Sequence, residues 1–190
     1  PYPAIAKPAF EGSSIGVHAT SLVDSPQEAI TSIGKMLADY QQPIMVEQFI
    51  SGDEITVGLV GNTPAKVIGM MRILPRQKTE KFVYSVEVKR DWKNLVDYEA
   101  PVKMEKSILN VIEKMSLKVF QLLGCRDFAR IDFRVSKDGI PYMLEINPLP
   151  GLGDYSDLVI MAQKMGWTHA ALIVAVFNAA LERCKLCPSA

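Results

Sequence analysis

The sequence predicts an α+β protein in which mainly antiparallel strands are flanked by helices. Short apolar runs such as 55–60 and 65–73 are separated by turn residues, which is typical of antiparallel sheets. Two longer segments, near 102–123 and 168–185, carry apolar residues at helical spacing. The strand–helix–strand alternation of a parallel sheet is not apparent.

Composition sets the frame for this prediction. With 190 residues the chain is long enough to bury a core, as one domain or two small lobes. Lys plus Arg equals Asp plus Glu, at 21 each, so bulk charge does not favour nucleic acid or an anionic membrane as a partner. The longest apolar stretch, 170–181, is interrupted by Asn178 and is too short to span a bilayer. We therefore expect neither nucleic acid nor membrane as a partner.

The three cysteines, Cys125, Cys184 and Cys187, do not form the framework of a secreted disulfide protein, which favours a reducing, cytoplasmic setting. Cys184 and Cys187 have C-x-x-C spacing at the end of a helical pattern. Because no further ligands accompany them, incidental thiols are favoured over a redox or metal role. No signal peptide opens the chain, and "PYPAIAKPAF" enters a strand-like run without an initiator Met. We expect the sequence to be a piece of a longer protein.

The first half of the chain is expected to hold short strands and one helix. The expected strands are 4–7, 43–50, 55–60, 65–73 and 82–89. Ser25-Pro-Gln-Glu28 is a capping box with proline at the first helical position, so a helix should run to about Tyr40. A glycine-bearing loop, 11–16, follows the first strand, and Gly61-Asn62 is a turn signal.

The second half is expected to contain a helix, a hairpin and two further helices. Apolar residues recur at helical spacing between 102 and 123, and Gly124 fits the position just after the helix end. Asp138-Gly139 between two alternating runs predicts a β-hairpin with a two-residue type I′ turn. Helices are expected near 156–164 and from about 168 to 185.

The predicted hairpin carries four polar side chains on one face. If the Asp-Gly pair is central to the turn, Asp132 lies opposite Glu145 and Arg130 lies opposite Asn147. Like charges directly opposite each other destabilise a sheet, so Asp132 and Glu145 require a cation between them. Carboxylate and amide oxygens suit Mg²⁺, and Arg130 is placed to pair with a carboxylate or hold a developing anion. The alternative is a solvated sheet face with mixed charges. The other face takes the apolar residues Ile131, Phe133, Leu144 and Ile146.

Two further stretches have features of nucleotide sites. Lys7 precedes Gly12-Ser-Ser-Ile-Gly16, whose small residues can wrap phosphate oxygens while the lysine adds a point charge. This loop lacks the P-loop and dinucleotide spacings, so a flexible turn is the alternative. Glu47 and Glu54 lie around a turn between strands, where backbone groups suit an adenine and a carboxylate suits ribose hydroxyls. A surface hairpin explains that stretch equally well.

Taken in order, five stretches resemble the ATP-grasp superfamily, and within it the D-alanine–D-alanine ligase group. They are "AIAKPAFEGSSIGV", "VEQFISGDEITVGLVGN", "YSVEVK", "GCRDFARIDF" and "YMLEINPLPG". The resemblance implies an ATP-grasp fold in which two lobes clasp ATP. It assigns 1–46 to the remainder of the central subdomain and 47–190 to the C-terminal catalytic subdomain. The substrate domain and the front of the central subdomain would be missing, and this chain alone is expected to be inactive.

The resemblance also implies roles for individual residues. Those that would bind ATP are Lys7, Ser13, Ser14, Glu47, Gln48, Ile50, Glu54 and Lys89. Ser13 would also help to close the loop over the active site, and Arg130 would stabilise the acyl phosphate and the tetrahedral intermediate. Gly151 and Ser156 would receive the carboxylate of the second substrate. Two Mg²⁺, or Mn²⁺ in their place, would be held by Asp132, Glu145 and Asn147.

The chemistry implied is ATP-driven peptide-bond formation between two small amino acids, through an acyl phosphate, for peptidoglycan precursors. The resemblance implies a homodimer formed through the missing domain. Two departures leave the second substrate open. Arg90 follows Lys89 where this group usually carries tyrosine, and Asn147-Pro-Leu-Pro150 replaces the usual Asn-Thr-x-Pro. A ligase for another amino acid, a peptide or a hydroxy acid is one alternative. A non-catalytic nucleotide-binding fragment is another, which the intact polar set disfavours.

Overall fold

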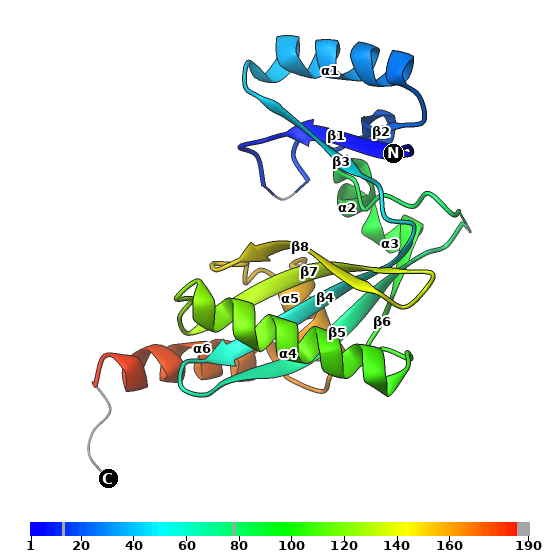
Figure 1. The fold of residues 1–190 in the computed structure, drawn as a ribbon. Coiled ribbons are helices and arrows are strands. Elements are labelled where there is room, and N and C mark those ends of the chain that lie inside the picture. The colour runs from blue at the N-terminus through cyan, green and yellow to red at the C-terminus, as the bar shows by residue number, and fades with distance from the viewer. Residues whose placement is uncertain (13, 78, 186–190) are drawn as a thin grey trace. The chain divides into compact units, whose positions relative to one another are not determined.

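The computed structural model describes residues 1–12, 14–77 and 79–185, which form two compact units (Figure 1). The first unit comprises 1–51 and 75–97, and the second comprises 52–74 and the described chain from 98 onward. Both combine strands and helices, so the predicted α+β class is confirmed. The expected division at 46/47 placed 75–97 in the second part, whereas its contacts place it in the first unit.

A three-stranded sheet of order β2-β1-β3 forms the first unit. Its strands are β1 (Ala4–Pro8), β2 (Leu22–Val23) and β3 (Ile44–Gln48), and η1 (Ala19–Ser21) precedes β2. Helix α1 (Pro26–Tyr40) packs against all three strands. It begins where the capping box predicts, because the Ser25 side chain accepts a hydrogen bond from the Glu28 N–H and Pro26 is the first helical residue.

The predicted strand 82–89 is wrong. Its second half forms the short helix α2 (Val86–Arg90), which is followed by α3 (Trp92–Leu95). The side chain of Ser85 caps α2 by accepting from the Val88 N–H, Glu87 lies in the first turn, and the last turn is basic. Because these local interactions favour a helix, they outweigh a period-two pattern that extends over only a few residues.

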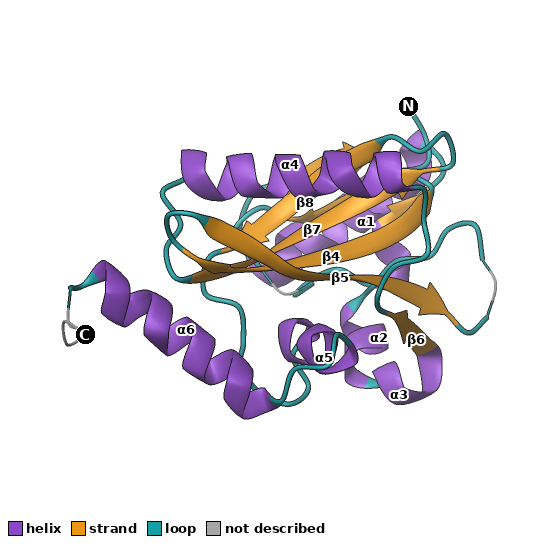
Figure 2. Cartoon of the chain, turned by 90° about the horizontal axis from the view of Figure 1, so that it is seen from below, coloured by secondary structure: helices purple, strands orange, loops and turns teal. Residues whose placement is uncertain are grey.

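A five-stranded sheet of order β6-β5-β4-β7-β8 forms the second unit. Its strands are β4 (Gly52–Gly61), β5 (Ala65–Pro75), β6 (Val96–Glu99), β7 (Phe128–Ser136) and β8 (Pro141–Asn147). Neighbours from β5 through β4 and β7 to β8 pair antiparallel. Figure 2 shows α4 (Lys106–Leu122) on one face of this sheet, and α5 (Asp157–Lys164) and α6 (His169–Arg183) on the other.

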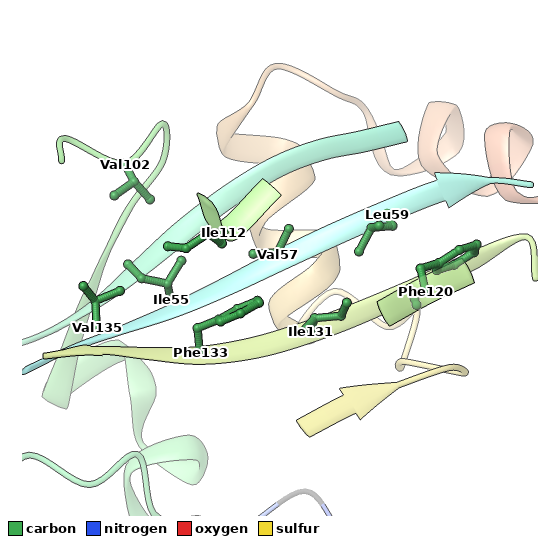
Figure 3. Close-up of a cluster of buried hydrophobic side chains, with 10 residues drawn as sticks. Ile55, Val57, Leu59, Val102, Ile112, Phe120, Ile131, Phe133 and Val135 are labelled. Carbon is green, nitrogen blue, oxygen red and sulfur yellow. The ribbon is translucent and has the colours of Figure 1, made fainter. Parts of the chain in front are cut away.

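The core of the second unit lies between the sheet and α4. Odd-numbered residues of β4 and β7 point toward this helix, and Ile112 and Phe120 of α4 meet them (Figure 3). The strand residues of this cluster are Ile55, Val57, Leu59, Ala129, Ile131, Phe133 and Val135. Because side chains alternate along a strand, the even-numbered residues of both strands face α5 instead.

The hairpin β7–β8 has the predicted partners but a different turn. Asp132 lies opposite Glu145 and Arg130 opposite Asn147, as predicted. Near the turn, however, Ser136 and Ile140 exchange hydrogen bonds across a three-residue loop, and only Gly139 of that loop has positive φ. A two-residue type I′ turn requires positive φ at both central positions, so that prediction is wrong.

The pairing of β7 with β8 shifts between Asp132 and Phe133, and this β-bulge restores the predicted pairing. The extra residue, Leu144, is exposed rather than on the apolar face where the sequence placed it. The longer loop and the bulge therefore cancel, and the polar side chains meet as expected.

Among the described residues, no single helix is long and apolar enough to cross a membrane. The helix pair α5 and α6, bent by 112°, passes the same test by length and composition only.

Candidate functional site

The centre of the candidate site is an ion pair on the α5 face of β7. Arg130 Nη2 donates to Asp132 Oδ2 at 2.9 Å, and Arg130 Nε is 3.1 and 3.2 Å from the two Asp132 oxygens. Thr56 on β4 donates from Oγ1 to Asp132 Oδ1 at 2.9 Å. Arg130 and Asp132 are each 8% exposed, so this pair is largely shielded from solvent.

Glu145 and Asn147 on β8 complete the predicted polar face. Asn147 Nδ2 donates to Glu145 Oε1 at 2.9 Å and to Asp132 Oδ2 at 3.4 Å. Arg130 Nη2 lies 3.7 Å from Glu145 Oε1. The Glu145 side chain is 43% exposed, so solvent and small ions reach it. The structure thus brings all four predicted hairpin residues together.

The predicted cation between Asp132 and Glu145 is supplied by the chain itself, so the repulsion between these two carboxylates does not require a metal ion. The guanidinium of Arg130 contacts both carboxylates, and the Asn147 amide donates to both. These two groups relieve the like-charge repulsion within the chain itself. Whether a metal ion fits here therefore depends on the charge and donor atoms of the whole cluster, which comprises Arg130, Asp132, Glu145, Asn147 and the groups that contact them.

Asp157 is a member of the cluster that the sequence analysis missed. It is the first residue of α5, and its Oδ2 lies 3.6 Å from Arg130 Nη1, with both side chains 10% exposed. Burial alone lowers the pKa of Arg130, but Asp132, Asp157 and Glu145 outweigh this and hold the pKa above its ordinary value. Counted as ionised, three carboxylates face one guanidinium, which leaves two negative charges uncompensated.

This donor set fits a hard divalent cation in its chemistry. Carboxylate and amide oxygens are the ligands that Mg²⁺ prefers, and two uncompensated negative charges match its charge. Among the described residues, no group of three or more His, Cys, Asp or Glu is arranged as a metal centre. The predicted ligands, Asp132, Glu145 and Asn147, comprise two carboxylates and one amide, whose NH₂ now faces the carboxylates. To bind an ion, Asn147 would have to turn its oxygen toward it.

Lys7 and Glu47 form a second predicted group, on the sheet of the first unit. Lys7 Nζ lies 2.5 Å from Glu47 Oε2. In the pairing of β1 with β3, Ile5 is opposite Glu47 and Lys7 is opposite Met45, so the two charged side chains are diagonal neighbours. Ala4 and Ala6 alternate with them and are buried, which leaves Lys7 and Glu47 on the open face of the sheet.

At the end of β3, two further residues predicted to bind ATP differ in exposure. Gln48, the last residue of β3, is exposed, whereas Ile50 in the following loop is half-buried.

Ser14 and Lys89 both meet Tyr84 in the first unit. Ser14 Oγ donates to the Tyr84 carbonyl oxygen at 3.0 Å, and Lys89 Nζ lies 5.0 Å from the centre of the Tyr84 ring. A lysine at this distance gains a cation–π interaction with the ring. The structure therefore places the loop serine and Lys89 near one another. Ser13 lies outside the described residues.

Glu54 in the second unit is engaged in an ion pair that the sequence did not predict. Its Oε2 lies 3.2 Å from Arg134 Nη1 on the neighbouring strand β7, and its side chain is 12% exposed. Arg134 Nη2 also donates to the Gly52 carbonyl oxygen. Burial lowers the pKa of Arg134 despite its acidic neighbours. A ribose hydroxyl would have to share this carboxylate with Arg134.

Gly151 and Ser156, predicted to bind the second substrate, are in direct contact. Ser156 Oγ donates to the Gly151 carbonyl oxygen, immediately before α5 begins. Ser156 is buried and Gly151 is exposed. Because α5 starts at Asp157, the same turn brings the Ser156 hydroxyl and the Arg130 cluster into one region of the second unit.

The residues missed by sequence reasoning had weak local signals. Thr56 stands in an apolar strand where threonine is unremarkable, and Arg134 belongs to the same alternating pattern as Arg130 and Asp132. Extending that alternation by one step would have found Arg134. Asp157 follows the helix-capping position, so it is explained there as a first-turn acid without any further role.

Comparisons with known proteins find similar sequences and structures over most of the chain. Residues 1–178 match the protein family described as "D-ala D-ala ligase C-terminus". A D-alanine–D-alanine ligase from Ruthia magnifica subsp. Calyptogena magnifica is 34% identical over 179 residues, which cover 94% of this chain and 57% of that protein. The chain spans about half the length of the curated relatives it matches.

Solved structures show the same fold. The D-alanine–D-alanine ligase of Bacillus anthracis matches with a TM-score of 0.74 and 26% identity, covering 97% of this chain and 56% of that one. A structure of the Bacillus anthracis ligase complexed with ATP matches with a TM-score of 0.72 and 24% identity, covering 97% of this chain and 54% of that one. These likenesses confirm the predicted fold and the predicted resemblance.

Proposed function

Since this chain belongs to the D-ala D-ala ligase C-terminus family, we propose that it supplies the catalytic portion of an ATP-dependent carboxylate–amine ligase. In this reaction the carboxylate of one amino acid takes the γ-phosphoryl group of ATP, and the amine of a second displaces phosphate to form a peptide bond. The product proposed is D-alanyl-D-alanine, a precursor of peptidoglycan. The curated relatives named D-alanine–D-alanine ligase support this assignment.

The observation that carries the proposal is the convergence of Arg130, Asp132, Glu145 and Asn147 beside the start of α5. Phosphoryl transfer needs neutralisation of charge on the transferring oxygens, and little covalent chemistry from the protein. Bound Mg²⁺ would supply that neutralisation. Asp132, Glu145 and Asn147 would hold two such ions, and Glu145 is the most exposed carboxylate of the cluster.

Arg130 would bind the anion that develops on the acyl group. Its guanidinium is fixed from two sides, by Asp132 at Nε and Nη2 and by Asp157 at Nη1. A donor that is already oriented needs no reorganisation when charge develops, which is the source of its catalytic effect. Its raised pKa keeps it charged throughout.

In the first unit, Lys7 and Lys89 would contact ATP phosphates, and the loop 12–16 would close over them. Lys7 is paired with Glu47, so nucleotide binding would exchange this carboxylate for phosphate oxygens. Glu47 would then be free to bind the adenine amino group, beside the backbone of Gln48 and Ile50. Ser13 and Ser14 would complete the loop. In the second unit, Glu54 would contact the ribose.

The second substrate would bind at Gly151 and Ser156. A serine hydroxyl has one proton to donate, and that of Ser156 now goes to the Gly151 carbonyl oxygen. To receive a substrate carboxylate, the hydroxyl would have to turn away from Gly151. This local change would couple substrate binding to the turn that precedes α5.

A second candidate function differs only in the acceptor. Arg90 and the sequence Asn147-Pro-Leu-Pro150 depart from the usual pattern of D-alanine–D-alanine ligases. Both lie beside predicted site residues, Lys89 and Gly151. A ligase that joins another amino acid, a peptide or a hydroxy acid would keep the same phosphoryl chemistry.

The remaining predictions concern the whole protein. We infer a cytoplasmic location, which the unpaired cysteines and the small, soluble substrates support. We further propose that the full-length protein is a homodimer and that its partners are small amino acids rather than nucleic acid or membrane.

The test is phosphate release by the full-length protein with MgATP across D-alanine, other D- and L-amino acids, and D-lactate. Strict dependence on D-alanine is the result expected for the main proposal. Release that requires another acceptor would select the second candidate. Binding of MgATP without release under any condition would instead support a non-catalytic nucleotide-binding fragment.

A further inference from the structure

The loop that follows β1 is held against the segment that begins α2, within the first unit. Ser14 Oγ donates to the Tyr84 carbonyl oxygen at 3.0 Å, and the Val86 N–H donates to the Val17 carbonyl oxygen at 3.2 Å. These contacts join residues about seventy positions apart in the sequence. They fix both ends of the segment 14–17, which we call the docked loop.

A third contact lies just beyond the docked loop, at His18. Its Nδ1 is hydrogen-bonded to Glu87 Oε1, and Ser85 Oγ donates to Glu87 Oε2 at 2.6 Å. Both oxygens of the Glu87 carboxylate are therefore engaged. The contact with His18, followed by that with Ser85, lowers the pKa of Glu87 to about 2. The Glu87 side chain is 53% exposed.

The backbone of the docked loop needs such support. Ser14 has a φ of 63° and Gly16 a φ of 76°, both in the left-handed region. This conformation is unfavourable for serine, and at position 16 an added Cβ would lie 2.4 Å from Pro8 Cγ. A loop with such a backbone keeps one conformation only when surrounding contacts hold it.

Lys89 lies on the same short helix as Glu87, one half-turn further along. The His18–Glu87 contact therefore ties the docked loop to the helix that positions Lys89. Any displacement of α2 relative to the loop would break the contact. The loop and Lys89 consequently form one assembly within the first unit.

We propose that His18 and Glu87 are positioning residues for ATP, which hold the docked loop and Lys89 in fixed relation before the nucleotide binds. This inference rests on the proposed function, in which the loop and Lys89 contact phosphates. Preorganisation raises affinity because the ordering of the loop does not have to accompany binding. Neither residue contacts the reacting atoms. Arg90 stands where the resemblance leads one to expect a tyrosine tied to loop closure, and the His18–Glu87 contact supplies such a tie in this chain.

The experiment compares variants of the full-length protein for MgATP affinity by calorimetry and for amide hydrogen exchange at 14–18 without nucleotide. His18→Ala and Glu87→Gln should each weaken MgATP binding by up to about fivefold, as expected for the loss of one exposed side-chain contact. Both should also speed exchange in the docked loop. The double variant should bind MgATP with the same affinity as the single variant that binds it less tightly, because the two residues act through one contact. His18→Asn, whose amide can donate in place of Nδ1, should restore most of the affinity.

Asp24→Asn is the matched control. It breaks the Lys81–Asp24 ion pair, which also joins distant segments of the first unit and has similar exposure. Its affinity and loop exchange should match those of the unaltered protein.

Any of four results would overturn the inference. One is unchanged loop exchange in His18→Ala, and another is additive loss of affinity in the double variant. The third is an equal loss in the Asp24→Asn control. If the unaltered protein itself fails to bind MgATP, the proposed function fails with it. The fourth result, normal binding in every variant, would reject the positioning role alone.

Discussion

Asp132 accepts hydrogen bonds from Arg130 and Thr56, and both of its oxygens are engaged. Glu145, by contrast, is bonded by one neutral amide and lies further from the guanidinium. A cation that enters the cluster therefore meets less competition at Glu145 than at Asp132. Mutation of Glu145, the most exposed carboxylate of the cluster, should therefore remove the charge neutralisation most easily.

Glu145→Gln should abolish most Mg²⁺-dependent binding of ATP while the protein still folds. The change keeps the side-chain shape and removes one of the two negative charges that remain uncompensated. Calorimetry of ATP with and without Mg²⁺ measures the effect, for which we expect at least about a tenfold loss of affinity, or roughly 1.4 kcal/mol. Asp138→Asn, the same chemical change at the exposed turn of this hairpin, is the control. Equal affinities of Glu145→Gln and the unaltered protein would reject the shared metal site.

Asp157→Asn should lower turnover more than it lowers affinity for ATP. Loss of the Asp157 charge frees Nη1 of Arg130, and small misplacements of a catalytic group cost up to about 100-fold in rate. We expect a fall in kcat of roughly tenfold with a small change in KM for ATP. Steady-state kinetics of the full-length ligase measures both values.

Asp154→Asn, a change three residues earlier at an exposed acid, is the comparison for Asp157→Asn. Its kcat should stay within twofold of the unaltered value. A raised KM with unchanged kcat in Asp157→Asn would show that Asp157 serves binding rather than the placement of Arg130.

At the scale of elements, α6 is tied to the sheet by Asp127. Arg183 near the end of α6 donates from Nε and Nη2 to the two oxygens of Asp127, at 2.9 and 2.8 Å. Asn62 donates both to Asp127 and to the Ala179 carbonyl oxygen. Asp127 therefore links the ends of β4 and α6 through two partners.

The stability of this link should depend on pH. The bonds from Arg183, and then from Asn62, outweigh burial and lower the pKa of Asp127, with Arg126 adding to the effect. A carboxyl group whose folded pKa is lowered stabilises the fold above its ordinary pKa, and the effect is lost as the pH falls through the folded value. Asp127→Asn should accordingly lower the urea midpoint at pH 7. The difference in urea midpoint between this variant and the unaltered protein should become smaller as the pH falls below 4. Asparagine tolerates the positive φ of this position, so the comparison isolates the charge. A pH-independent difference would contradict the prediction.

Two glycines should respond in opposite directions to alanine. Gly52 at the start of β4 has a φ of 148°, and an added Cβ would lie 1.9 Å from the Val135 carbonyl oxygen. Gly52→Ala should therefore destabilise the second unit by more than about 2 kcal/mol. Gly34 lies inside α1 with open space around its Cα, so Gly34→Ala should stabilise the first unit by about 0.5 to 1 kcal/mol. Urea unfolding measures both, and a loss of stability at position 34 would count against the helix described.

At the scale of the whole molecule, the two units have cores of different size. Among the described residues, a cluster of ten buried residues packs between the sheet of the second unit and α4, whereas a cluster in the first unit joins the three smaller side chains of Ala4, Val23 and Ala29. Buried apolar area is the main favourable term in folding, so the first unit should be the less stable of the two.

The two tryptophans allow this difference to be measured. Trp92 lies in the first unit and Trp167 in the second. In the variants Trp167→Phe and Trp92→Phe, fluorescence follows each unit separately during urea unfolding. The transition seen through Trp92 should have the lower midpoint. Coincident transitions would show that the units unfold as one cooperative system.

Local features of this protein were predictable because their causes lie within a few residues. The capping box at Ser25 set the start of α1, and apolar periodicity placed α4, α5 and α6 to within a few positions. The opposition of Asp132 and Glu145 was also found, since alternation and a turn signal are both local. That prediction held although the turn was wrong, because a bulge compensated for the longer loop.

The sequence by itself therefore determined the family, the main elements and the four polar residues of the hairpin. Tertiary structure alone decided that 75–97 belongs to the first unit and which groups surround Arg130. The partners Thr56 and Asp157 reach the Arg130–Asp132 pair from β4 and α5. Capping and periodicity act between neighbours in the chain, whereas these contacts exist only after the strands pair and α5 packs against them.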